Sequence, residues 1–314
     1  MLSARLFWPI LFLCGLATVP ALAPQKVEAP SLAAYLGFDR NDYPGDDALP
    51  SLRKTFSFTS YWLGPPPGEK RSSWLGKRAL LQSQGFGFAV LFNGRESRAL
   101  HKSAEARQKG TLDAQSAVKL AQQEGFAKST VIFLDIEEGG RLPGPYHEYL
   151  QAWSNTLAKV GYRAGVYCSE MPVDEGQGVH ITTAQDIQAH ITSAGFIYWV
   201  YNDACPPAPG CAFPANPLPP AQSGFSVATI WQYAQSPRRK EFTAHCPANY
   251  AADGNCYAPE DTAHKWFLDA NVSTSANPSA PQKIRQPFDR REGNSTLLNL
   301  LDCVGTSSRA VAHR

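Results

Sequence analysis

The sequence has no large excess of charge of either sign, and it has no long apolar run beyond its first residues. Its 314 residues include 29 Lys and Arg and 27 Asp and Glu, which gives a formal net charge of +2. Binding to phosphate backbones depends on an excess of basic residues, so this balance argues against a nucleic-acid partner. No later stretch reaches the roughly 18 apolar residues of a membrane-spanning helix, so we expect no membrane partner.

Several common catalytic motifs are absent as well. There is no G-x-S-x-G nucleophile motif, and Gly85-Phe86-Gly87 leads into a strand-like run rather than a helix, so it is not a dinucleotide loop. His147-Glu148 lacks the second histidine of a zinc protease, and the other histidines and cysteines match no zinc-finger spacing. We therefore expect no cofactor and no metal.

Residues 1–23 have the pattern of a secretory signal peptide. Arg5 supplies a positive charge, residues 6–15 form an apolar segment, and Ala21-Leu22-Ala23 resembles a small-residue cleavage site. The apolar segment is too short to span a bilayer. The pattern predicts export to the periplasm or the extracellular space, and we expect the mature chain to be a soluble monomer.

The cysteines also suit an exported protein. Six of the seven follow the signal segment: Cys168, Cys205, Cys211, Cys246, Cys256 and Cys303. An even number in an exported chain predicts disulfides. Cys205 and Cys211 bracket one loop and Cys246 and Cys256 another, which would leave Cys168 for Cys303, although other pairings stay open. A thiol nucleophile at Cys168, with His147 or His190 as base, is a weaker alternative.

Short apolar or aromatic runs alternate with segments of helical spacing. The strand-like runs are 34–38, 56–63, 86–92, 130–136, 163–168, 196–201, 227–233 and 266–268. The helical segments are 73–84, 113–124, 145–160 and 184–193, with Asp113 as a candidate N-cap and with Gly125 and Gly161 as stops. This order predicts a single α/β domain, a (β/α)₈ TIM barrel over residues 24–276 with extended loops at its C-terminal face, followed by a tail, 277–314, that partly packs on the barrel.

The motif Asp135-Ile136-Glu137 ends the fourth strand-like run. Side chains two residues apart on a strand share a face, so Asp135 and Glu137 should point to the same side. Two carboxylates at the mouth of a barrel raise each other's pKa, which lets one stay protonated and act as an acid. The alternative is a helix N-terminus whose first acids favour the macrodipole.

Two further acids lie at equivalent positions. Asp39 directly follows the first strand-like run and Asp269 follows the eighth. The ends of these strands open onto the same mouth in a closed barrel, so both carboxylates could converge with Asp135 and Glu137. The alternative is that each caps a helix or a turn.

Aromatic residues accompany these acids near the strand ends. The candidates for contact with a sugar are Tyr61, Tyr167, Trp199 and Trp231. Aromatic rings stack on the flat C–H faces of sugars, so this set is typical of a carbohydrate site. Alternation along each strand allows at most half of such residues to face the pore.

Together, five motifs carry a family resemblance. They are Gly37-Phe38-Asp39, Tyr61-Trp62-Leu63-Gly64-Pro65, the run 132–137, the run 161–169 and Ile230-Trp231-Gln232-Tyr233. In this order they resemble the glycoside-hydrolase-like domain of unknown function 1906, a group similar to the glycoside hydrolase family 25 lysozymes. The resemblance extends over residues 36–273 and implies a (β/α)₈ barrel. One departure is Asn41, where family 25 enzymes usually have serine.

The resemblance implies roles for the candidate residues. Glu137 would be the general acid/base, Asp135 its electrostatic partner, and Asp39 and Asp269 the other acids. The implied activity is hydrolysis of glycosidic bonds in peptidoglycan or another extracellular polysaccharide. An inactive glycan-binding or cell-envelope protein on the same barrel remains the alternative.

Overall fold

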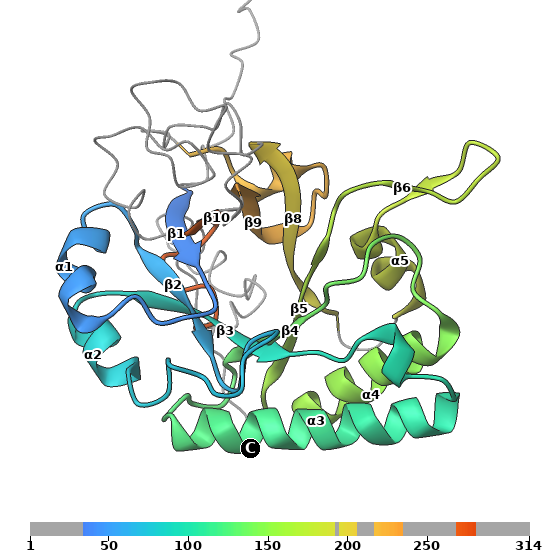
Figure 1. The fold of residues 1–314 in the computed structure, drawn as a ribbon, viewed down its shortest axis with the longest axis horizontal. Coiled ribbons are helices and arrows are strands. Elements are labelled where there is room, and N and C mark those ends of the chain that lie inside the picture. The colour runs from blue at the N-terminus through green and yellow to red at the C-terminus, as the bar shows by residue number, and fades with distance from the viewer. Residues whose placement is uncertain (1–33, 192–194, 206–216, 235–267, 281–314) are drawn as a thin grey trace, which may run out of the picture. The chain divides into compact units, whose positions relative to one another are not determined.

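The structure is a computed structural model that describes residues 34–191, 195–205, 217–234 and 268–280, and the side chains of residues 203–205 are not described. Its centre is a closed barrel in the strand order β1-β10-β9-β8-β5-β4-β3-β2 (Figure 1). The strands are β1 (Tyr35–Asp39), β2 (Phe58–Trp62), β3 (Gly87–Asn93), β4 (Val131–Asp135), β5 (Arg163–Ser169), β8 (Ile197–Cys205), β9 (Ala228–Ala234) and β10 (Asp269–Ser273). The predicted α/β barrel class is confirmed.

The helices lie between consecutive strands of the barrel. They are α1 (Leu49–Leu52), α2 (Arg78–Ser83), α3 (Ser103–Gln123), α4 (Gly144–Lys159) and α5 (Thr183–His190), with the short 3₁₀ turns η1 (Asp46–Ala48), η2 (Ser97–Ala99) and η3 (Pro220–Ser223). A two-stranded hairpin of β6 (Val173–Asp174) and β7 (His180–Ile181) precedes α5. Gly125 and Gly161 have φ angles of 75° and 86° just after α3 and α4, as expected of helix stops.

Helix α3 begins well before the predicted start, and Asp113 is not its N-cap. Arg95 donates hydrogen bonds of 2.6 Å to each carboxylate oxygen of Asp113, and the Tyr149 hydroxyl donates a third at 2.9 Å. Asp113 is therefore an ion-pair partner within the helix. The first half of α3 is mostly polar and exposed, so it lacks the apolar spacing on which the prediction depended.

The eighth barrel strand differs from the predicted one in position and in direction. Residues 266 and 267 lie outside the described part, and β10 starts at Asp269. It runs antiparallel to both β1 and β9, whereas the other neighbouring barrel strands are parallel. The N-terminal end of β10 therefore lies at the rim where the parallel strands have their C-terminal ends.

The inner face of the barrel is filled by large rings, and a glycine makes room for one of them. A Cβ at Gly165 on β5 would lie 2.4 Å from the Phe133 ring on β4. Phe133 in turn packs edge-to-face on Trp199 of β8, with ring centroids 5.7 Å apart. Side chains alternate along strands, so Asp135 and Tyr167 lie on this same inner face, above Phe133 and Gly165.

Cys168 forms no disulfide among the described residues, and its predicted partner, Cys303, lies outside them. Cys168 is a free thiol, wholly buried in the wall of the barrel on the face of β5 opposite to Tyr167. Burial raises the pKa of this thiol far above its ordinary value, which also argues against a nucleophilic cysteine. The side chain of Cys205 and all of Cys211, Cys246, Cys256 and Cys303 lie outside the described part of the chain.

The two ends of the chain are described only in part. The predicted signal segment, 1–23, and residues 281–314 lie outside the described residues. The start of the predicted tail packs on the barrel: Ser279 N–H donates to the Phe88 carbonyl at 2.8 Å, and Phe88 N–H donates to Asn277 Oδ1 at 2.9 Å. Within the described residues, no helix is long and apolar enough to cross a membrane.

Candidate active site

A cavity of about 430 Å³ opens at the C-terminal ends of β3 and β4. The carboxylates of Asp135 and Glu137 line it, so the two acids of the Asp-x-Glu motif face the same space. The rest of the lining comes from the segments after β2, β3 and β4: Pro67, Gly68, Asn93, Gly94, Arg95, Glu96, Arg98, Ala99 and Glu138.

The backbone around Asp135 fixes the position of the motif. Ile136 N–H donates to the Tyr167 carbonyl at 3.0 Å, which extends the pairing of β4 with β5 toward Glu137. On the other side, Gly94 N–H donates to the Asp135 carbonyl at 3.1 Å. A Cβ at position 94 would lie 2.1 Å from that oxygen, so only glycine allows this close approach. Asp135 is buried, whereas Glu137 is exposed at the mouth.

The two acids have different protonation preferences. Burial raises the pKa of Asp135 well above its ordinary value, and the charges of Glu137 and Asp39 raise it further. Partial desolvation also raises the pKa of Glu137, but a hydrogen bond with Asp135 counteracts this rise. Burial therefore favours the protonated form of Asp135 more strongly than that of Glu137. Carboxylate pairs with such different surroundings are typical of sites that transfer protons.

Asp39 lies in the barrel beside this pair, although it does not line the 430 Å³ cavity. It is only 8% exposed, and its Oδ1 accepts hydrogen bonds from Asn271 Nδ2 at 2.6 Å and from Gln232 Nε2 at 2.9 Å. Burial raises the pKa of Asp39 to about 6, against the effect of both hydrogen bonds, and the charge of Glu137 adds to the rise. Burial thus favours the protonated form of Asp39, whereas the two hydrogen bonds favour its ionised form.

Two further contacts orient the amides that bind Asp39. The Trp199 indole N–H donates to Asn271 Oδ1 at 2.8 Å, and the Tyr167 hydroxyl donates to Gln232 Oε1 at 3.0 Å. With both amide oxygens occupied, both amide NH₂ groups point to Asp39. Asn271 and Gln232 were not predicted from the sequence as residues of the site. Alternation could have indicated them, because Asn271 is two residues after Asp269 and Gln232 faces opposite to Trp231.

Asp269 lies at the mouth as the first residue of an antiparallel strand, whereas the prediction placed it just after the end of a parallel strand. It is the first residue of β10 and lies opposite Asp39 in the antiparallel register. Its backbone carbonyl accepts a hydrogen bond from Asn271 Nδ2 at 3.2 Å. Residues 269 and 271 share a face of β10, so the Asp269 side chain is directed to the same side as the Asn271 amide.

Of the four predicted aromatic residues, Tyr167 lies closest to the acids. Its ring stacks on Tyr201 with centroids 5.0 Å apart, and the charges of Asp39 and Glu137 help to raise the pKa of its hydroxyl. Trp199 is wholly buried between Phe133 and Tyr167, so it orients Asn271 and leaves no surface for a sugar.

Tyr61 and Trp231 do not face the mouth, so their predicted contact with a sugar is wrong. Tyr61 is wholly buried between the sheet and the helices, where its hydroxyl donates to Glu124. Trp231 is on the face of β9 opposite to Gln232 and donates from Nε1 to Asn202 Oδ1 at 2.7 Å. The neighbour of Tyr61, Trp62, is on the inner face instead and donates to the Arg40 carbonyl at 3.1 Å.

A family model matches the middle part of the chain. Residues 73–207, from before α2 to just after β8, match the model "Rv2525c-like, glycoside hydrolase-like domain". This part of the chain is similar to the domains of that family. The resemblance predicted from the sequence motifs is thereby confirmed. No curated protein matches the chain.

Solved structures that are similar to this chain come from several bacteria. An uncharacterized protein of B. stearothermophilus is 17% identical, with 76% of this chain and 95% of that chain covered and a TM-score of 0.49. The Tat-secreted protein Rv2525c of Mycobacterium tuberculosis is 14% identical, with 80% and 99% covered and a TM-score of 0.45. A bacterial lysozyme from Streptomyces coelicolor is 15% identical, with 78% and 98% covered and a TM-score of 0.43.

Proposed function

We propose that the protein is an exported glycoside hydrolase that cleaves peptidoglycan or another extracellular polysaccharide by carboxylate acid/base catalysis. The observation that supports this most is the convergence of Asp39, Asp135 and Glu137 on the inner face of the barrel, two of them lining the 430 Å³ cavity. Their pKa values are raised to different extents, and such separation is how one site provides both an acid and a carboxylate at neutral pH.

In the proposed reaction, Glu137 protonates the glycosidic oxygen as the bond to the leaving sugar breaks. Asp135 supplies this proton through its hydrogen bond with Glu137. Asp39, ionised and oriented by Asn271 and Gln232, stabilises the positive charge that develops on the sugar ring, or positions a nucleophile such as the acetamido group of the substrate. Water then adds to the sugar and returns a proton to the pair. Asp269 would be the fourth acid of the site.

The surface around the cavity suits a substrate rich in hydroxyl groups. Arg95 and Arg98 line it together with carboxylates, so its wall offers both hydrogen-bond donors and acceptors. The Arg95 side chain is oriented by its two hydrogen bonds with Asp113, and its backbone carbonyl accepts a hydrogen bond from the Tyr146 hydroxyl at 2.7 Å. The family resemblance is the reason for proposing peptidoglycan as the substrate. The polar lining of the cavity is the reason for proposing a polysaccharide in general.

The test is the release of sugars from purified peptidoglycan and from chitin oligomers by the wild type and by Glu137→Gln. We expect the variant to keep its circular dichroism and melting temperature and to lose about 10²-fold to 10⁴-fold in turnover. A matched control is Glu148→Gln, which removes a carboxylate that pairs with Arg107 on the helical layer, and which should retain activity. Undiminished turnover in Glu137→Gln would contradict the proposed role.

One observation favours a second candidate, a glycan-binding protein without activity. Asp39 does not line the cavity, and hydrogen bonds from two amides occupy one of its oxygens. A barrel that keeps these acids only for folding would bind saccharides without releasing products. Equal binding of chitin oligomers by the wild type and Glu137→Gln, with no product from either, would support this candidate.

A further inference from the structure

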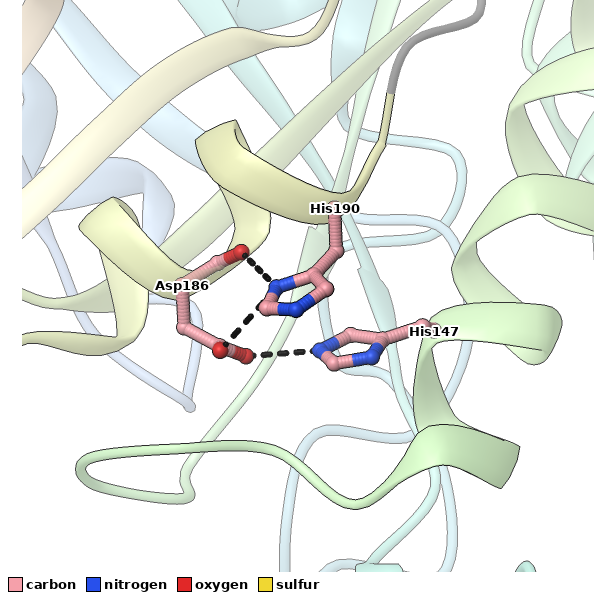
Figure 2. A group of neighbouring side chains, drawn as sticks. All are labelled: His147, Asp186 and His190. Atoms are coloured by element: carbon pink, nitrogen blue, oxygen red, sulfur yellow. Dashed lines mark hydrogen bonds and ion pairs between the residues drawn. The ribbon is translucent and has the colours of Figure 1, made fainter.

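A second cluster of chemically active side chains lies away from the cavity, where α4 and α5 meet (Figure 2). His147 comes from the first turn of α4, and Asp186 and His190 come from α5. His147 Nε2 is 2.7 Å from Asp186 Oδ2, and His190 Nδ1 is 3.2 Å from Asp186 Oδ1. One ligand-type atom from each of the three residues lies within 4.8 Å of the other two.

We propose that His147, Asp186 and His190 bind a divalent transition-metal ion, with Zn²⁺ as the best match. Two imidazoles and one carboxylate are a ligand set that Zn²⁺ uses, with a water molecule completing the four-coordinate site. Donors on a tetrahedral zinc ion lie roughly 3.3 Å apart, which matches the 3.2 Å between His190 Nδ1 and Asp186 Oδ1. The 2.7 Å between His147 Nε2 and Asp186 Oδ2 would have to lengthen to admit the ion.

The burial of Asp186 is the second observation that points to a cation. Its side chain is wholly buried, and its Oδ1 accepts no hydrogen bond among the described residues. Buried carboxylates are normally neutralised by full pairing or by a metal. Oδ2 is better satisfied, because it also accepts a hydrogen bond from Leu142 N–H at 3.0 Å.

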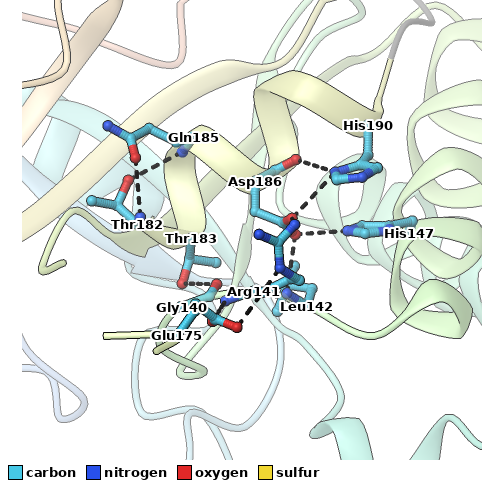
Figure 3. A network of polar contacts seen from close by, with 10 residues as sticks. All are labelled: Gly140, Arg141, Leu142, His147, Glu175, Thr182, Thr183, Gln185, Asp186 and His190. Atoms are coloured by element: carbon cyan, nitrogen blue, oxygen red, sulfur yellow. Dashed lines mark hydrogen bonds and ion pairs between the residues drawn. The ribbon is translucent and has the colours of Figure 1, made fainter. Parts of the chain in front are cut away.

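Among the described residues, one basic side chain contacts the cluster, and it also pairs with a second carboxylate (Figure 3). Arg141 Nη1 lies 3.9 Å from Asp186 Oδ1, while Arg141 Nε lies 3.7 Å from Glu175 Oε2. Arg141 is exposed, and Glu175 remains its partner when an ion binds to Asp186. The guanidinium is therefore a competitor of the ion that can be removed by mutation without deleting a ligand.

Binding requires one imidazole to turn. The rings of His147 and His190 are stacked, with centroids 4.2 Å apart and planes 10° from parallel, so their lone pairs do not yet meet at one point. The His190 side chain is 42% exposed, whereas His147 is largely covered, so His190 is the ring with room to turn. Its rotation would give up the 2.8 Å hydrogen bond between His190 Nδ1 and the Asp186 carbonyl oxygen. The ion would replace the direct contact between His147 Nε2 and Asp186 Oδ2.

The cluster is linked to the segment that carries Glu137. Besides the Leu142 contact, Thr183 Oγ1 on α5 donates to the carbonyls of Glu138 at 3.0 Å and of Gly140 at 3.1 Å. An ion that joins α4 to α5 would restrain this segment between β4 and α4. We expect the ion to stabilise the fold, and this expectation does not depend on the proposed hydrolase activity.

The experiment is a calorimetric titration of the chelator-treated full chain with ZnCl₂ at pH 7.5, with melting temperatures measured in parallel. The wild type should bind one equivalent and melt at a higher temperature with zinc. His147→Gln and His190→Gln should each weaken binding by roughly 100-fold or more, since even loss of a supporting contact costs about 10-fold to 100-fold. Both variants retain a side chain that can accept or donate hydrogen bonds, which keeps the fold testable.

Two controls separate this site from other zinc ligands. His101→Gln changes an exposed histidine elsewhere and should bind as the wild type does, and Arg141→Gln should bind zinc at least as tightly. Absence of saturable binding, or equal binding by the wild type and a His147→Gln/His190→Gln double variant, would overturn the proposal and leave the cluster as a hydrogen-bonded link between helices.

Discussion

Asp39, the last residue of β1, lies directly opposite Asp269, the first residue of β10, in the antiparallel pair that closes the barrel. Because β10 runs in the reverse direction, its first residues reach the rim that the other strands reach with their last. The same register brings the amide of Asn271 within 2.6 Å of Asp39. The reversed strand thus completes the polar environment of the acids.

The first prediction concerns the hydrogen bond between Asn271 and Asp39. Replacing Asn271 with leucine, which has a similar size, removes a donor that lowers the pKa of Asp39 from the value burial alone would impose. Hydrogen bonds to charged groups contribute about 1.5–3 kcal/mol, so the pKa of Asp39 should rise above 6 by roughly one unit or more. Carboxyl ¹³C chemical shifts measured against pH would report this directly. An unchanged titration of Asp39 would show that Gln232 alone controls its ionisation.

The second prediction concerns stability and pH. The pKa of Asp39 is about 6 in the folded protein and about 3.8 when unfolded, so the folded state binds the proton more tightly. This contribution to stability is fully present below pH 3.8 and is lost as the pH rises through 6. Asp39→Asn cannot ionise, and it should gain about 3 kcal/mol relative to the wild type between pH 4 and 7. Urea unfolding at several pH values measures the difference, and a constant difference across this range would contradict the prediction.

The third prediction separates Tyr61 from Trp62. Tyr61→Phe removes the hydroxyl that donates to Glu124 between the sheet and the helices, and it should lower the free energy of unfolding by about 1 kcal/mol without changing saccharide binding. Trp62→Phe alters the inner face and should weaken saccharide binding. Isothermal titration with chitin oligomers compares the two variants. Weaker binding by Tyr61→Phe alone would restore the original assignment.

The face of the strand on which Tyr61 lies could not be predicted from the sequence pattern. The pairing of Asp135 with Glu137 could be predicted, because side chains two residues apart on a strand share a face. This holds whether that face is the inner or the outer one. For Tyr61 the face itself had to be chosen, and all five residues of β2 are buried, so no polar alternation distinguishes inside from outside. The same holds for most of β9 around Trp231.

Two other features depend on tertiary structure alone. The direction of β10 is determined by how the preceding chain returns to the barrel, and the residues of β10 have the same pattern in either direction. The contact of His147 with Asp186 joins residues from different helices, and no short spacing connects them. By contrast, the ends of α3 and α4 could be predicted, because glycines at positive φ follow both helices.

The fourth prediction is that Cys168 does not react in the native protein. Its thiol is wholly buried and its pKa is raised by burial and by Glu170, so little thiolate forms and no reagent reaches it. Iodoacetamide labelling followed by peptide mass spectrometry should find Cys168 unmodified before denaturation and modified afterwards. Rapid native labelling at Cys168 would support the cysteine-hydrolase alternative. A Cys168-to-Cys303 disulfide would appear as a crosslinked peptide that is absent after reduction.

The fifth prediction isolates the hydrogen bond from Trp199 to Asn271. Trp199→Phe leaves the buried Asn271 oxygen without its donor, so its amide can turn away from Asp39. Trp153→Phe is the matched control, because Trp153 is equally buried and its indole N–H has no partner among the described residues. Both variants lose similar ring volume. Trp199→Phe should therefore cost about 1–3 kcal/mol more in the free energy of unfolding, and it alone should raise the pKa of Asp39. Equal costs, with an unchanged Asp39 titration in both variants, would show that packing rather than the hydrogen bond accounts for Trp199.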